Sequence, residues 1–143
     1  MRKTSFLAVA LLMATPAMAI EPPPETLIGN WEVTGVTVDD TPVAALVTDD
    51  PSFMGAVLSI AADKIEWTKG TDERPIDPTI DNCDQAANFA LTDGNYIVTC
   101  GDGGWGPGDG ATIRPIDEND ISLIWYDGGT LTLTRVETVK PKG

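Results

Sequence analysis

Histidine is absent from the 143 residues of this chain. Without it, Ser-His-Asp and Cys-His nucleophiles, histidine general bases and histidine metal ligands are all excluded. Basic residues are scarce too: 9 Lys and Arg stand against 22 Asp and Glu, for a formal net charge of −13. Because a phosphate backbone is bound by basic surface, we expect no nucleic acid partner. A basic protein or a cation would be attracted, although such charge also serves solubility alone.

Long hydrophobic runs are missing as well. The apolar stretch from Phe6 to Met13 is far shorter than the ~20 residues that span a bilayer, and no other run is longer, so we expect no membrane span. It follows a charged start and precedes Ala17-Met18-Ala19, an arrangement typical of a secretory signal peptide. We therefore expect residues 1–19 to be removed between Ala19 and Ile20, giving a periplasmic or secreted protein. No cysteine lies at that position, so no lipid anchor is expected.

Only two cysteines are present, Cys83 and Cys100, both in the exported part. An even count in an oxidising compartment predicts one disulfide. The two lie too far apart in the chain for a thioredoxin-type redox pair, so the predicted role is structural. Acidic pairs such as Asp39-Asp40 fall in expected turns rather than across a cleft, which does not favour a two-carboxylate hydrolase. We expect no enzymatic activity, no cofactor and no metal site.

The exported part consists of short apolar stretches separated by turn residues, without a long window of helical periodicity. A Pro-rich extended leader (20–26) precedes one domain (27–138) and a tail (139–143). The segment Val43–Val47 fits either an edge strand or a short helix near residues 42–47 with Pro42 at its first position. The other predicted strands are Ile28–Val38, Ala56–Ile60, Ile65–Thr68, Phe89–Thr92, Asn95–Cys100, Ala111–Ile116, Ile121–Tyr126 and Thr130–Val136. About eight antiparallel strands with one apolar face predict an all-β fold, a single up-and-down barrel or a sandwich, of which we favour the barrel.

Two hairpins have registers that follow from their turns. The turn at residues 61–64 pairs Ile60 with Ile65 and Leu58 with Trp67. The turn Asp93-Gly94 pairs Leu91 with Tyr96 and Phe89 with Val98. Both registers gather apolar side chains on one face, as a sheet with one buried side requires.

The last hairpin has two possible registers. A two-residue loop after Tyr126 would place Leu123 and Trp125 opposite threonines. We prefer a three-residue loop, which pairs Trp125 with Leu131, Leu123 with Leu133 and Ile121 with Arg135. The predicted core is Trp31, Val33, Leu58, Ile60, Ile65, Trp67, Phe89, Leu91, Tyr96, Val98, Leu123, Trp125, Leu131 and Leu133.

Gly29-Asn30-Trp31 and Arg135 resemble two features of the lipocalin and avidin (calycin) superfamily of small barrels. There a Gly-x-Trp opens the first strand, and an arginine from the end of the chain lies across the indole. The resemblance implies that Trp31 plugs one end of a barrel while Arg135 covers its ring through a cation–π contact. Otherwise Trp31 is a core aromatic of another β fold. Too few residues follow Val136 for the long helix of true lipocalins, so only the architecture is carried over.

Two long connections are the candidate working surfaces: Gly70–Ala86 and Gly101–Gly110. Trp105 lies among glycines in the second, either as an exposed interaction anchor or folded back as a lid. Asp102 and Asp109 flank it, but their spacing fits neither an EF-hand nor a Gly-Asp calcium repeat.

Two binding functions are consistent with these features. The first is a monomeric, non-catalytic binding protein that holds a small apolar ligand in the barrel, with Trp67 and Trp105 near the mouth and Asp102 and Asp109 beside it. The alternative is an inhibitor of a basic enzyme, acting through loops 70–86 and 101–110. Small exported β-barrels with one disulfide that inhibit lysozymes and proteases are similar in size and cysteine count, and opposite charge would speed their encounter.

Overall fold

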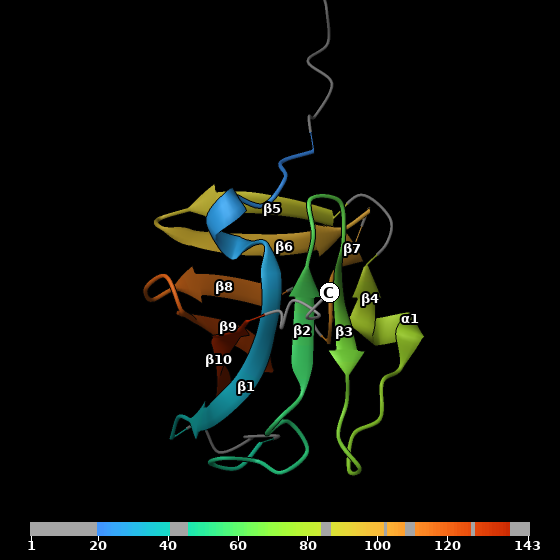
Figure 1. Ribbon diagram of the computed structural model, residues 1–143, viewed down its shortest axis with the longest axis vertical. Coiled ribbons are helices and arrows are strands. Elements are labelled where there is room, and N and C mark those ends of the chain that lie inside the picture. The colour runs from blue at the N-terminus through green and yellow to red at the C-terminus, as the bar shows by residue number, and fades with distance from the viewer. Residues whose placement is uncertain are drawn as a thin grey trace, which may run out of the picture.

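A computed structural model describes residues 20–40, 46–83, 87–101, 103–107, 111–126 and 128–137 (Figure 1). The expected signal peptide, the tail 139–143, residues 43–45 of the ambiguous segment, and Asp102 and Asp109 lie outside these residues. The elements are η1 (Glu25–Leu27), β1 (Gly29–Val38), β2 (Val57–Ile60), β3 (Ile65–Lys69), α1 (Pro78–Asp81), β4 (Asn82–Cys83), β5 (Ala87–Thr92), β6 (Asn95–Cys100), β7 (Gly103–Gly104), β8 (Ala111–Pro115), β9 (Asp120–Tyr126) and β10 (Gly129–Val136). In the described part, no helix is long and apolar enough to cross a membrane.

All the strands belong to one curled antiparallel sheet with the order β4-β3-β2-β1-β10-β9-β8-β6-β5, and β7 pairs with β6 beside this path. Strands that are consecutive in the chain pair with each other, apart from β4 with β5 and β7 with β8, and the last strand, β10, pairs with the first, β1. Figure 1 shows the two halves of the sheet crossing at a steep angle, so one face curls around the interior. The fold is therefore all-β and barrel-like, as predicted, but it is open between β4 and β5.

The strand count corrects the prediction, since the described residues form ten strands rather than eight. The two additional strands, β4 and β7, hold two residues each. Strands this short have no readable alternation of polar and apolar residues, so the sequence pattern could not reveal them.

The Cys83–Cys100 disulfide is confirmed, with its two Cα atoms 5.6 Å apart. Cys83 lies in β4, one edge of the sheet, and Cys100 lies in β6, next to the opposite edge strand β5. The bond thus joins the two sides of the sheet at the gap that backbone hydrogen bonds leave open.

The first two hairpin registers are confirmed: Leu58 pairs with Trp67 and Phe89 with Val98, together with their neighbouring pairs. The preferred register of the third hairpin is wrong by two residues, because Leu123 pairs with Leu131 and Ile121 with Leu133. Tyr126 pairs with Gly129 around a two-residue loop, and a bulge at Trp125 then shifts the register by one. The bulge restores the apolar residues of both strands to one face, which a plain two-residue loop would not allow.

The predicted core is buried except at the tip of the β5–β6 hairpin. Leu91 is 60% exposed, and its partner Tyr96 is only partly buried against the core. Leu91 lies on an edge strand beside the turn, where no further strand covers it. Core side chains absent from the predicted set come from strands, among them Val36, Ile113 and Ile121, and from η1 and the loops, among them Leu27, Phe53 and Trp105.

The Pro-rich leader lies along the edge of β5. The amide of Phe89 donates to the carbonyl of Glu21 (2.8 Å), and the amide of Glu21 donates to Oδ1 of Asn88 (2.7 Å). Pro23 is buried, and the chain then turns through η1 into β1. These contacts bring Gly29 and Trp31 to one end of the curled sheet.

Candidate functional site

Each end of the curled sheet has a buried tryptophan covered by an arginine. At the end where β1 begins, Trp31 is fully buried, and the guanidinium carbon of Arg135 lies 4.3 Å from the centre of its ring. Trp31 and Arg135 are directly paired across β1 and β10, so the sheet register itself creates the contact. The indole N–H of Trp31 donates to the carbonyl of Leu27 (2.9 Å). The arginine contact that the Gly-x-Trp motif implies is therefore present.

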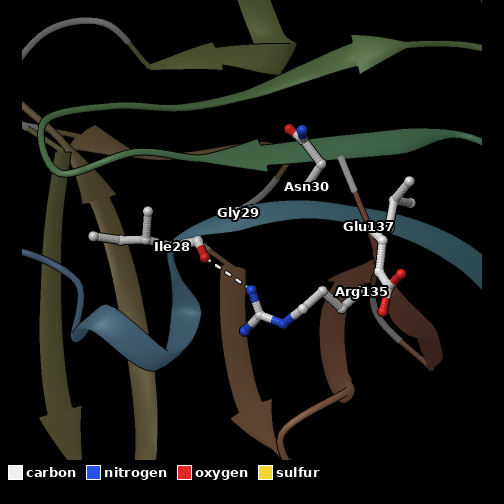
Figure 2. A pocket seen from close by; sticks show the side chains of 6 residues that line it. Ile28, Gly29, Asn30, Arg135 and Glu137 are labelled. Atoms are coloured by element: carbon white, nitrogen blue, oxygen red, sulfur yellow. Dashed lines mark hydrogen bonds between the residues drawn. The ribbon is translucent and has the colours of Figure 1, made fainter. Parts of the chain in front are cut away.

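Three backbone carbonyls fix the Arg135 guanidinium in place. Nη1 donates to Ile28 (2.9 Å), Nη2 to Thr26 (2.6 Å) and Nε to Glu118 (3.2 Å). Figure 2 shows the guanidinium beneath the start of β1. Gly29 has φ +144°, and a Cβ there would lie 2.7 Å from Nη1 of Arg135. The glycine of the motif thus allows the arginine to approach the backbone.

Two open hollows border this arginine. One, of about 430 Å³, is lined by Ile28, Gly29, Asn30, Arg135, Val136 and Glu137 (Figure 2). The other, of about 350 Å³, is lined by Thr26, Glu118, Asn119 and Arg135. Because all three guanidinium nitrogens already donate to carbonyls and acidic residues stand beside both hollows, we assign this end a structural role.

The opposite end is filled by four aromatic rings. Trp67 meets Trp125 edge to face with centroids 5.6 Å apart, and Trp105 meets Trp125 at 4.5 Å. Phe53 contacts Trp67 at 6.2 Å. All four side chains are at most 2% exposed. The interior at this end is therefore occupied by the protein's own rings.

Arg74 covers this aromatic cluster. Its guanidinium carbon lies 4.7 Å from the ring centre of Phe53, 5.8 Å from that of Trp67 and 5.9 Å from that of Trp125. Nη2 pairs with Oδ1 of Asp81, whose side chain is fully buried while that of Arg74 is 18% exposed. A buried carboxylate is tolerated when a cation and further donors satisfy it, and the amide of Asp77 donates to its Oδ2 (2.7 Å).

A hydrogen bond and the disulfide join the two long connections. The indole N–H of Trp105 donates to the backbone carbonyl of Asp81 (3.2 Å), and the disulfide lies at the base of both segments. Gly106 has φ +85°, and a Cβ there would lie 2.6 Å from Cζ3 of Trp125. Glycine is therefore needed for the second loop to pack onto the ring.

The predicted site residues Trp67 and Trp105 are brought together, with Trp125 between them. The interpretation of Trp105 as an exposed anchor is wrong, since it is 1% exposed and folded back onto the interior, the alternative that the sequence left open. The glycines around Trp105 do not leave its ring without packing partners. They let the loop fold so that the ring packs onto the interior. Pattern reasoning missed Arg74 and Asp81, because a charged pair in a Pro-rich loop is usually solvated and has no diagnostic spacing.

Polar groups around the cluster are unevenly satisfied. In the part of the chain that the structure describes, the indole nitrogens of Trp67 and Trp125 are buried without a hydrogen-bond partner. Outside the cluster, hydrogen bonds from the Thr79 hydroxyl and amide hold the pKa of Asp77 below its ordinary value. Those from the Ser52 hydroxyl and amide do the same for Asp50.

The described residues contain no group of three Cys, Asp or Glu side chains placed to hold a metal ion. No family model, no curated protein and no solved structure matches the chain.

Proposed function

We propose that this chain is an exported, non-catalytic binding protein that recognises a basic protein through a loop platform. The loop platform consists of residues 70–83 and 103–107. The observation that carries the proposal is the filled interior: Trp67, Trp105 and Trp125 take the place that a ligand would need. A barrel whose interior is taken up by its own side chains offers its loops as the binding surface.

The conformation of the platform is fixed before any partner arrives. The amide of Thr71 donates to the carbonyl of Arg74 (3.0 Å), and the amide of Arg74 donates back to Oγ1 of Thr71 (3.1 Å). Oγ1 of Thr71 also donates to the carbonyl of Ser52 (2.7 Å), which ties the loop to the segment before β2. Such preorganisation lowers the entropy cost of binding.

The outer side of the platform has the chemistry to bind a basic surface. Asp72, Glu73 and Asp77 are exposed there, and Ile80 is 45% exposed on α1. Arg74 is turned inward and pairs with buried Asp81, so the outer side of the platform keeps a net negative charge. Complementary charge speeds encounter, and an apolar side chain among charges is a suitable anchor. Basic lysozymes and secreted proteases are partners of this kind in the compartment that we propose.

An interior ligand is the second candidate function. The two unpartnered indole N–H groups of Trp67 and Trp125 support it, because buried donors normally have an acceptor. The Trp31–Arg135 contact supports a lipocalin-like origin for such a site. Native mass spectrometry of the mature protein under non-reducing conditions separates the candidates. If the loop platform is the binding surface, the protein should show the mass of its polypeptide alone. A retained molecule of a few hundred daltons would favour the interior ligand.

The platform is tested by titrating the protein with a purified basic lysozyme and with a secreted protease, following binding and enzyme inhibition. Asp72→Lys/Glu73→Lys should weaken binding at least tenfold, since it reverses two platform acids. Glu25→Lys/Asp63→Lys makes the same change in net charge at exposed positions outside the platform and should weaken binding far less. Equal losses in both double variants would show that net charge alone acts, and no binding to either enzyme would reject this partner class.

A further inference from the structure

The edge strand β5 lacks the side chains that usually protect an exposed edge. It ends the sheet order, and its sequence from Ala87 to Thr92 has no charged residue and no proline. Within the whole β5–β6 hairpin, residues 87–100, the turn residue Asp93 is the one charged side chain, although the chain has 22 acidic residues. Edge strands are commonly kept from pairing with other chains by charges or proline. The protection of β5 must therefore come from outside its own sequence.

The Pro-rich leader gives this edge a partner. The amide of Phe89 donates to the carbonyl of Glu21 (2.8 Å), so Phe89 directs its amide away from β6. The amide of Glu21 donates to Oδ1 of Asn88 (2.7 Å). Both backbone groups of Glu21 thus point at β5, as those of a paired strand residue do. Figure 1 shows the leader passing β5 before it turns into η1.

The other side of the leader is unsuited to pairing with a further strand. In extended backbone, successive residues direct their amide and carbonyl groups to opposite sides, so Pro22 presents its backbone outward. Proline has no amide hydrogen, and within sheets it is confined to edges where the missing donor would face solvent. Pro24 has no donor either, and its carbonyl accepts from the amide of Leu27 (2.9 Å). The leader thus covers one edge without creating another.

The leader is anchored close to this contact. Pro23 is buried, and Leu27 is 1% exposed and belongs to the core. Leu27 follows Glu21 within one short turn, so the leader is held beside β5. A short tether gives an effective concentration on the order of millimolar. Two hydrogen bonds can therefore keep the leader in place.

We propose that the leader protects β5 from the addition of another extended chain. Strand addition to a sheet edge is a recurrent mode of peptide binding, and it needs free backbone donors and acceptors. The leader occupies the amide of Phe89 and presents Pro22 in its place. The chain that it excludes is an extended, apolar peptide, because β5 has no charge that would repel one. The proposal does not depend on the loop platform.

Hydrogen exchange of single amides tests whether the leader occupies the edge. The amide of Phe89 should be protected in the wild-type protein. Asn88→Ala and Glu21→Pro remove the same hydrogen bond from its two sides, and each should speed exchange at Phe89 about fivefold, as expected for one lost hydrogen bond. The amide of Ala90, which points to β6, is the internal control and should not change. A Phe89 amide that exchanges like an exposed one in wild type would overturn the proposal.

A fluorescein-labelled peptide with the sequence of residues 87–92 tests strand addition, followed by fluorescence anisotropy. Wild type should not bind it. Asn88→Ala should, because its edge is less occupied, and so should Pro22→Thr, because threonine restores an outward amide and favours strands. Pro51→Thr, at an exposed proline before β2, is the matched control and should not bind. Thermal unfolding confirms that all variants are folded. Equal binding by wild type, or a failure of either variant to bind, would overturn the proposal.

Discussion

At the residue scale, two arginines close the two ends of the interior in different ways. Arg135 satisfies its donors with carbonyls and lies on one indole, whereas Arg74 pairs with buried Asp81 and lies near three rings. Both use the flat guanidinium as an apolar cover whose edge forms hydrogen bonds. Lysine could not reproduce this, because an ammonium has neither the flat face nor the fork of donors.

Arg135→Ala should lower the free energy of unfolding by about 3 kcal/mol. It removes a partly buried cation–π contact of about 1 kcal/mol and three hydrogen bonds to backbone carbonyls, at about 0.5–1.5 kcal/mol each. Arg135→Lys should recover less than half of the loss. Urea unfolding measures both, with Arg114→Ala as the control, since Arg114 has a single exposed side-chain bond. A cost for Arg135→Ala no greater than that of the control would contradict the structural role.

Sequence reasoning anticipated one of these arginines and not the other. Arg135 pairs with a Gly-x-Trp motif that has a fixed place at the start of a strand. Arg74 and Asp81 lie in a loop where neither helical nor strand periodicity applies, so nothing in their spacing separates a buried pair from solvated charges. The sequence left two placements of Trp105 open for a related reason, since glycine content indicates backbone freedom but does not say whether the tryptophan folds inward or outward.

At the element scale, turn chemistry decided most of the fold. Asp93-Gly94 fixed one register, and Gly35 lies at a bulge in β1, where the register shifts between Val33 and Gly35. Turn residues alone did not decide the register of the β9–β10 hairpin. The sequence allows two loop lengths, of which we prefer the longer, but the loop has two residues and a bulge at Trp125 returns the apolar residues of both strands to the buried face.

The cap of α1 should make the loop platform sensitive to acid. Hydrogen bonds from Thr79 lower the pKa of Asp77 in the folded protein below its ordinary value of 3.8. The stabilisation is therefore complete above about pH 4 and is lost as the pH falls through the lowered folded pKa. Asp77→Ser keeps a cap that does not titrate, so the stability advantage of wild type over this variant at pH 7 should shrink at pH 3.

Urea midpoints of both proteins at the two pH values measure this effect. Thr79→Ala removes the hydroxyl that is the largest cause of the lowered pKa, so it should reduce the pH dependence in the same direction. A wild-type advantage that is equal at pH 7 and pH 3 would show that the cap charge plays no part in stability.

At the scale of the whole molecule, the Cys83–Cys100 disulfide closes the gap that backbone hydrogen bonds leave between the two edges of the sheet. The sheet order ends in β4 and β5, and Cys83–Cys100 joins β4 to the strand beside β5. The cysteine pairing was predictable from the count alone, but its position across an open gap was not. That position depends on the strand order and on β4, a strand of two residues.

Cys83→Ala/Cys100→Ala should lower the free energy of unfolding by about 3 kcal/mol, from the entropy of a loop of this size in the unfolded chain. The loss should also loosen the loop platform, because the disulfide lies at its base. Unfolding by urea, compared with wild type under non-reducing conditions, gives the first quantity, and hydrogen exchange of residues 77–83 gives the second. A double variant as stable as wild type would show that hydrogen bonding and packing alone hold the two sides together.

The pairing of β1 with β10 also sets the order in which the molecule can be built. The first long strand to leave the ribosome has its neighbour on one side among the final residues of the domain. The centre of the sheet therefore cannot form until β10 has been synthesised, however early β2 and β3 pair. One edge of β1 thus stays unpaired while more than ninety residues are added, and the arrival of β10 is the event that joins the two halves of the sheet.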